Sequence, residues 1–121
     1  MAKKIVCLDF DDVINNYGSW ENEGFVKIKG KPMFGIKKAI KQFKKAGCKV
    51  FVHSVRCGYA GGRHAIILYL EKYHIKVDKV FVNKPPADVY VDDKAITFKG
   101  KWNKDMIQAI LEFKSWGNLT L

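Results

Sequence analysis

The stretch that decides the fold is IVCLDFDDVIN, residues 5–15, in which a short apolar run leads directly into three carboxylates. Residues 4–8 form a short apolar run with β-branched side chains and no helical period, which is typical of a strand buried on both faces of a parallel sheet. Asp9, Asp11 and Asp12 follow at once, although basic residues outnumber acidic ones in the whole chain. The position of these acids therefore needs a physical reason.

Length and composition indicate one compact domain. With 121 residues, of which 48% are hydrophobic, the chain can bury one core, and we expect residues 1–121 to form a single domain. Lys and Arg total 22 against 12 Asp and Glu, a net charge of +10, which favours phosphate-bearing or otherwise anionic partners. The three cysteines lack the close pairing of zinc or disulfide patterns and indicate reduced thiols in a cytoplasmic protein.

Neither a signal peptide nor a membrane span is expected. The apolar stretch after the basic start MAKK is interrupted at Asp9, which makes it too short for a signal peptide. The longest later apolar run, residues 65–70, is too short to cross a bilayer.

Strands and helices alternate along the chain. Residues 35–46 and 62–73 carry inward-facing apolar side chains at helical spacing, and residues 103–116 form a third amphipathic pattern with Asn103 as the expected N-cap. Short strands are expected at 49–52, 80–82 and 89–91, with 95–98 as a candidate for a last one. We therefore expect an α/β protein, with one Rossmann-like, open, mostly parallel sheet and helices on both faces. Only six residues separate 82 from 89, roughly 20 Å of extended chain, so the third strand is expected to be very short.

Polar side chains follow each of the main expected strands at its carboxyl end, where the strands of an open parallel sheet line a ligand crevice. These residues are Asp9 and Asp11 after the first strand, Ser54 and Arg56 after the second, Lys84 after the third, and Asp92 and Asp93 after the fourth. Two acidic groups brought together at one edge would repel each other unless a cation lay between them. An all-oxygen carboxylate site suits Mg²⁺, so the sequence predicts a Mg²⁺ site there.

In this arrangement the sequence resembles the haloacid dehalogenase-like (HAD) phosphohydrolases, from residue 5 to about residue 93. The family's four motifs are an apolar strand with Asp-x-Asp, a strand ending in Ser or Thr, a Lys often followed by Pro, and a strand ending in paired acids. The matching segments are IVCLDFDDV, KVFVHS, NKPP and DVYVDD. Each motif alone is weak, whereas four in this order, each at the end of an expected strand, form a specific pattern.

The resemblance implies a small phosphatase without a cap domain that acts through an aspartyl-phosphate. Asp9 would be the nucleophile and Asp11 the general acid and base. Ser54 would bond a phosphoryl oxygen, and Lys84 would balance the charge of the nucleophile and of the transferring group. The implied Mg²⁺ ligands are the Asp9 carboxylate, the Asp11 backbone carbonyl and Asp92, with Asp93 as an outer ligand.

Two further residues near the motifs stay open. Asp12 stands where the family frequently has glycine, and aspartate tolerates left-handed backbone better than most residues, so we expect the motif to remain functional. The role of the Asp12 side chain is not indicated by the sequence. Arg56 is either a phosphate contact, because its spacing from Ser54 directs it back to the crevice, or a surface residue.

The sequence leaves no room for the cap domain that many members of this family carry. Residues 16–31 are long enough only for a flap hairpin, and residues 57–77 are accounted for by one helix and its flanks. The crevice is therefore expected to be open, which suits a large substrate or a cover supplied by a homo-oligomer partner. Together with the net charge of +10, this favours a nucleotide or a phosphorylated nucleic-acid end as the substrate.

Two other functions remain as alternatives to the phosphatase. A phosphoacceptor signalling domain also uses strand-end acids, a hydroxyl residue and a lysine, but it places the lysine after the last acid, whereas Lys84 precedes Asp92. A nucleic-acid-binding module with structural acids would bind with a steep salt dependence and release no phosphate. No segment of the chain matches a known reading motif for nucleic acid, so the sequence favours the phosphatase.

Overall fold

The computed structural model describes residues 4–16 and 26–116. Its elements are β1 (Ile5–Leu8), β2 (Asn15–Asn16), β3 (Lys31–Pro32), α1 (Ile36–Lys45), β4 (Lys49–His53), η2 (Val55–Gly58, a 3₁₀ helix), α2 (Gly62–Lys72), β5 (Lys79–Phe81), β6 (Val89–Val91) and α3 (Lys104–Glu112). The main expected strands and the first two helices thus form within one residue of the expected bounds. Residues 95–98, the candidate last strand, form none.

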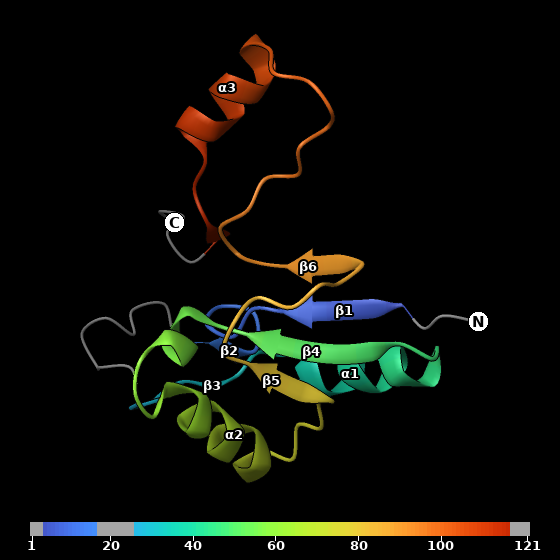
Figure 1. Ribbon diagram of the computed structural model, residues 1–121, viewed down its shortest axis with the longest axis vertical. Helices are drawn as coiled ribbons and strands as arrows, with labels where there is room; N and C mark the ends of the chain where they lie inside the picture. The colour runs from blue at the N-terminus through green and yellow to red at the C-terminus, as the bar shows by residue number, and fades with distance from the viewer. Residues whose placement is uncertain (1–3, 17–25, 117–121) are drawn as a thin grey trace.

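Four strands form one parallel sheet in the order β5-β4-β1-β6 (Figure 1). The α/β fold class with its parallel sheet is therefore confirmed. After β5 the chain returns past β4 and β1 to the opposite edge, a sideways distance of three strand spacings, or about 14 Å. Residues 82–88 can span this distance in extended form, which is why so short a connection still allows a parallel strand.

The two faces of the sheet are covered differently. Right-handed crossovers place α1 and α2 on the same face, because the steps from β1 to β4 and from β4 to β5 run in one direction. The residues that pack in this layer include Val6, Leu8, Val50, Val52 and Val80 from the strands and Ile40, Ile66 and Leu70 from the helices. The return from β5 to β6 runs the other way, so residues 82–88 cross the opposite face (Figure 1).

The connection between β5 and β6 positions Lys84. The Lys84 Nζ atom lies 4.2 Å from the centre of the Tyr90 ring on β6. The Tyr90 hydroxyl donates a hydrogen bond of 2.6 Å to the carbonyl oxygen of Pro85, which attaches the connection to the strand. Lys84 is therefore held at the sheet although it belongs to a loop.

Helix α3 stands apart from the sheet (Figure 1). Asn103 is its N-cap, as expected, because the Asn103 Oδ1 atom accepts a hydrogen bond of 2.9 Å from the Met106 backbone N–H. No residue of α3 is buried, and Ile107, Ile110 and Leu111 of its apolar stripe are exposed. The sequence pattern therefore predicted the helix, although it ends at Glu112 rather than at residue 116, and its stripe packs on no core within the described residues.

The ends of the expected flap hairpin at 16–31 are paired. β2 and β3 are antiparallel, with Asn15 opposite Pro32 and Asn16 opposite Lys31. Residues 17–25 lie outside the described residues, and residues 26–30 form no strand. The described base of the hairpin directly follows the loop that carries Asp11 and Asp12.

Two further expectations concern the cysteines and membranes. Cys7, Cys48 and Cys57 are free thiols, as expected. Among the helices that the structure describes, none combines the length and the apolar character that crossing a bilayer requires.

Candidate active site

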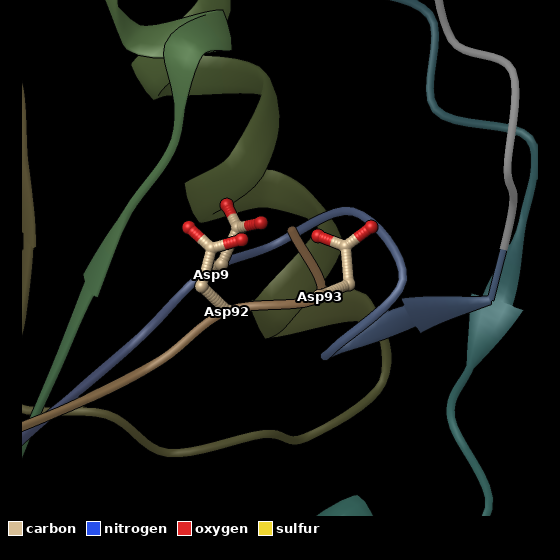
Figure 2. Close-up of side chains that lie close together, drawn as sticks. All are labelled: Asp9, Asp92 and Asp93. Atoms are coloured by element: carbon tan, nitrogen blue, oxygen red, sulfur yellow. The ribbon is translucent and has the colours of Figure 1, made fainter. Parts of the chain in front are cut away.

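Three carboxylates meet at the carboxyl ends of two adjacent parallel strands. Asp9 follows β1, and Asp92 and Asp93 follow β6. The two strands are in register up to Leu8 and Val91, and the Asp9 backbone N–H donates to the Val91 carbonyl oxygen at 2.9 Å. One carboxylate oxygen from each of the three acids lies within 4.8 Å of the others, and Figure 2 shows the three side chains on the same side of the strand ends. We call this group the acid cluster.

The electrostatics of the acid cluster disfavour three ionised carboxylates. Burial is the largest cause and the charge of Asp92 the next, and together they raise the pKa of Asp9 from 3.8 to about 8. The Phe10 backbone N–H, which donates to Asp9 Oδ1 at 2.9 Å, opposes the rise. A cation would relieve the repulsion, and carboxylate oxygens are the donors that hard cations prefer. The acid cluster could therefore hold a metal ion.

In the absence of metal, the free energy of unfolding is expected to fall as the pH rises from about 4 to about 8. Because the pKa of Asp9 is raised from 3.8 to about 8, the folded protein keeps a proton over this window that the unfolded chain has lost, so a higher pH favours unfolding. The Asp9→Asn protein lacks this carboxyl group, so its free energy of unfolding should change less with pH. Urea unfolding of both proteins in EDTA at about pH 5 and about pH 8 measures the difference. Equal slopes would contradict a raised pKa at Asp9.

A small cavity of about 90 Å³ adjoins the acid cluster. Its lining residues are Cys7, Asp9, His53, Lys84, Tyr90, Val91, Asp92 and Ala95. The structure thus brings Lys84 together with Asp9 and Asp92, as the sequence predicted from their strand-end positions. A lysine ammonium in this place opposes the negative charge of the carboxylates and of any phosphate that enters.

Asp11 is bonded to Arg56 rather than grouped with the acid cluster. The Arg56 Nε atom lies 2.8 Å from Asp11 Oδ2, and Nη2 lies 3.0 Å from Oδ1, so the pair is bidentate. The Arg56 side chain is 0% exposed, which shows that the interpretation of Arg56 as a surface residue was wrong. Its Nη1 atom also donates to the carbonyl oxygen of Lys27, in the segment that follows the undescribed part of the flap, at 3.3 Å. Arg56 therefore joins the loop after β1 to that segment.

Among the described residues, Asn15 and Tyr69 also lie in the surroundings of Asp11. The Asn15 side-chain amide donates to Asp11 Oδ1 at 3.2 Å, and the Tyr69 hydroxyl donates to Asn15 Oδ1 at 3.0 Å. Burial raises the pKa of Tyr69, so its hydroxyl stays protonated and remains a donor. The Asp11 carboxylate is therefore held from two directions, by a buried arginine and by a buried amide.

The turn after β4 places both Ser54 and Arg56. Ser54 is 2% exposed and caps η2, because its Oγ atom accepts a hydrogen bond of 3.2 Å from the Arg56 backbone N–H. A hydroxyl that accepts one hydrogen bond still has its own hydrogen to donate. At Gly62, the first residue of α2, a Cβ atom would overlap the Arg56 carbonyl group, so this close approach requires glycine.

Asp12 adopts left-handed backbone with φ 63°, a conformation that aspartate tolerates better than most residues. The Asp12 backbone N–H donates to the Asn15 carbonyl oxygen at 2.7 Å, which closes the turn after β1. The Asp12 carbonyl oxygen accepts a hydrogen bond of 2.8 Å from the Trp116 indole N–H. The chain beyond α3 therefore returns to the loop that carries the motif acids.

Sequence reasoning missed Asn15 and Tyr69, the residues that hold Asp11 together with Arg56. One signal for Tyr69 was present, because it lies at helical spacing beside Ile66 and Leu70, and a buried tyrosine needs a partner for its hydroxyl. No comparable signal marked Asn15, which stands in a polar stretch that is typical of a turn.

Comparisons with known proteins support the fold. No family model matches the chain, and no curated protein matches it. A chain in the structure of the Pnkp1/Rnl/Hen1 complex is similar with a TM-score of 0.54 and 18% sequence identity, over 95% of this chain and 36% of that chain. A crystal structure of a structural-genomics target from Vibrio cholerae has a TM-score of 0.50 and 18% identity, over 90% of this chain and 97% of that chain. This chain thus spans little more than a third of the first, and at such identity the similarity shows the parallel α/β fold alone.

Proposed function

We propose that the protein is a Mg²⁺-dependent phosphomonoester hydrolase of the HAD type, in which Asp9 forms an aspartyl-phosphate. The observation that carries the proposal is the acid cluster, whose carboxylate oxygens lie within 4.8 Å of one another at the ends of two adjacent parallel strands. Lys84 lines the cavity beside it. The order of the four motifs along the chain, which resembles that of the HAD phosphohydrolases, supports the same function.

Asp9 attacks the phosphorus atom of the substrate, and the bond from phosphorus to the leaving oxygen breaks. Water then attacks the phosphorus of the aspartyl-phosphate, which releases inorganic phosphate and restores the Asp9 carboxylate. Mg²⁺ bound by Asp9, Asp92 and the Asp11 carbonyl, with Asp93 as an outer ligand, would supply the positive charge that lets an anionic phosphate approach an anionic carboxylate. Such charge is needed because Asp9, with its pKa raised to about 8, is otherwise largely protonated at neutral pH.

The other motif residues act on the transferring group and the leaving group. Lys84 neutralises charge that develops on the phosphoryl oxygens, and Ser54 donates its hydroxyl hydrogen to one of them. Asp11 protonates the leaving oxygen and later takes a proton from the attacking water. Because both Asp11 oxygens accept hydrogen bonds from Arg56, this role requires Asp11 to give up one of these bonds and to take up a proton from solvent before it protonates the leaving oxygen. Arg56 thus acts through Asp11, as a positioning residue.

The substrate class that we propose is a nucleotide or a phosphorylated nucleic-acid end. We also propose that residues 1–121 form a single domain and that the protein is cytoplasmic. The net charge of +10 favours an anionic polymer. The cavity beside the acid cluster, at about 90 Å³, can hold little more than a phosphate group, so the rest of a substrate would lie outside it. A second copy of the chain is the proposed means of covering the site.

Phosphate release that depends on Mg²⁺ tests the proposed function. Wild-type protein is expected to release phosphate from an aryl phosphate and from 3′- or 5′-phosphorylated oligonucleotides with Mg²⁺, to stop in EDTA, and to recover when Mg²⁺ is added in excess. The physical reason is the charge of the acid cluster, which an approaching phosphate would meet without a counter-ion. Turnover that is indifferent to EDTA would contradict the metal-dependent mechanism. No turnover on any of these substrates would favour a phosphoacceptor or binding module instead.

A further inference from the structure

A basic and aromatic segment directly follows the acid cluster. Residues 94–104, which we call the basic aromatic loop, contain four lysines and no acid, and the next acid is Asp105. The rings of Phe98 and Trp102 lie 5.2 Å apart at 42° to each other. The two side chains are 49% and 67% exposed, so they form a pair on the surface rather than part of the core. The proposed hydrolysis assigns no role to this pair.

The basic aromatic loop is attached to the candidate active site. At its start, the Lys94 backbone N–H donates to Asp92 Oδ1 at 2.8 Å. At the end of residues 94–116, a segment that contains the loop and α3, the Trp116 indole N–H donates to the Asp12 carbonyl oxygen at 2.8 Å. Figure 1 shows that this segment leaves the sheet at the end of β6 and returns toward the same end of the sheet. A ligand bound along the loop would therefore extend away from the acid cluster, at which the loop begins.

The chemistry of the loop fits a single-stranded nucleic acid. Every base has a flat face that stacks on an exposed aromatic ring, and lysines beside the ring meet the phosphodiester charges. The four lysines are Lys94, Lys99, Lys101 and Lys104, all exposed. Because no acid interrupts them, the charge of this surface complements a polyanion. An acidic protein segment would use the lysines but not the exposed rings of Phe98 and Trp102.

We propose that the basic aromatic loop binds the single strand whose terminal phosphate the acid cluster hydrolyses. This inference rests on the proposed function, narrows its substrate class to single-stranded nucleic acid, and adds the surface that selects it. Bases stack on Phe98 and Trp102, and the lysines bind the backbone, so binding is tolerant of sequence and sensitive to salt.

Binding is measured without hydrolysis, by fluorescence anisotropy of labelled, unphosphorylated DNA and RNA oligonucleotides of mixed sequence in EDTA. Trp102→Ala is expected to weaken binding about tenfold, the size of one lost stacking contact. The double variant Lys99→Gln/Lys101→Gln is expected to lower the slope of log affinity against log salt by about 1.4, from two lost phosphate contacts. Leu111→Ala, an exposed apolar residue of α3, and Lys38→Gln/Lys41→Gln, exposed lysines of α1, are the matched controls and should bind as wild type.

A second measurement separates this inference from the proposed function. Trp102→Ala should lower kcat/KM on a phosphorylated oligonucleotide about tenfold and leave turnover of a small aryl phosphate unchanged. If the loop variants bind as wild type, or the controls lose as much affinity as they do, the assignment of the loop is wrong, whatever the aryl phosphatase activity. If wild type releases no phosphate while Trp102→Ala alone weakens binding, the loop assignment stands and the proposed function fails.

Discussion

Replacing Asp9 with asparagine is expected to lower Mg²⁺-dependent phosphate release by at least about 10⁴-fold, the order of loss that follows removal of a catalytic nucleophile. Asparagine keeps the shape of the side chain but lacks the anionic oxygen that attacks phosphorus. The change also removes one carboxylate from the acid cluster, so affinity for Mg²⁺ should fall as well. Initial rates with an aryl phosphate at saturating Mg²⁺ separate the loss of the nucleophile from the loss of metal affinity.

The Asp9→Asn protein should lose its activity without losing its fold. In the metal-free protein, Asp9 is disfavoured as an anion by burial and by Asp92, so a neutral amide should leave the free energy of unfolding at neutral pH unchanged or raise it. Asp105→Asn, which removes an exposed carboxylate from the first turn of α3, is the matched control and should keep full activity. An Asp9→Asn protein that keeps more than about 1% of wild-type turnover would rule out Asp9 as the nucleophile.

The acid cluster was predictable because it depends on strands rather than on loops. Short β-branched runs indicated buried parallel strands, and residues that end adjacent parallel strands meet at one edge. This rule grouped Asp9, Asp92 and Asp93 at one edge, and the strand order β5-β4-β1-β6 then shows that the strands before them are neighbours. The position of Lys84 was harder to predict, because it depends on the path of the connection between β5 and β6. This connection crosses a face of the sheet and is attached to β6 by Tyr90.

The environment of Asp11 was not predictable from its spacing. Asp11 lies two residues after Asp9, but the turn after β1 separates the two side chains, and the partner of Asp11 is Arg56, which is 45 residues away in the sequence. Periodicity carries no information about such a pair. The exposed stripe of α3 shows a related limit, since an apolar pattern predicts a helix with a face to bury but does not say what covers that face.

Removing the Arg56 side chain is expected to lower the free energy of unfolding by about 3–5 kcal/mol, the cost of leaving a buried charge without its partner. In Arg56→Ala, Asp11 keeps the amide of Asn15 but loses both guanidinium hydrogen bonds, in a site where Arg56 is 0% exposed. Arg56→Lys should restore only part of the loss, because an ammonium cannot replace the planar fork. Urea unfolding measures these differences.

Arg63, the chain's other arginine, is the matched control for Arg56. Its Nε atom donates one hydrogen bond of 2.7 Å to the Val80 carbonyl oxygen, so Arg63→Ala should cost only about 1 kcal/mol. A double-mutant cycle completes the argument, because Arg56→Ala/Asp11→Ala removes both charges and should be no less stable than Arg56→Ala alone. If the loss of unfolding free energy in the double variant equals the sum of the losses in the two single variants, the pair is not coupled. In that case Arg56 would stabilise the fold through its Lys27 bond and its packing, and Asp11 would not depend on it for its position.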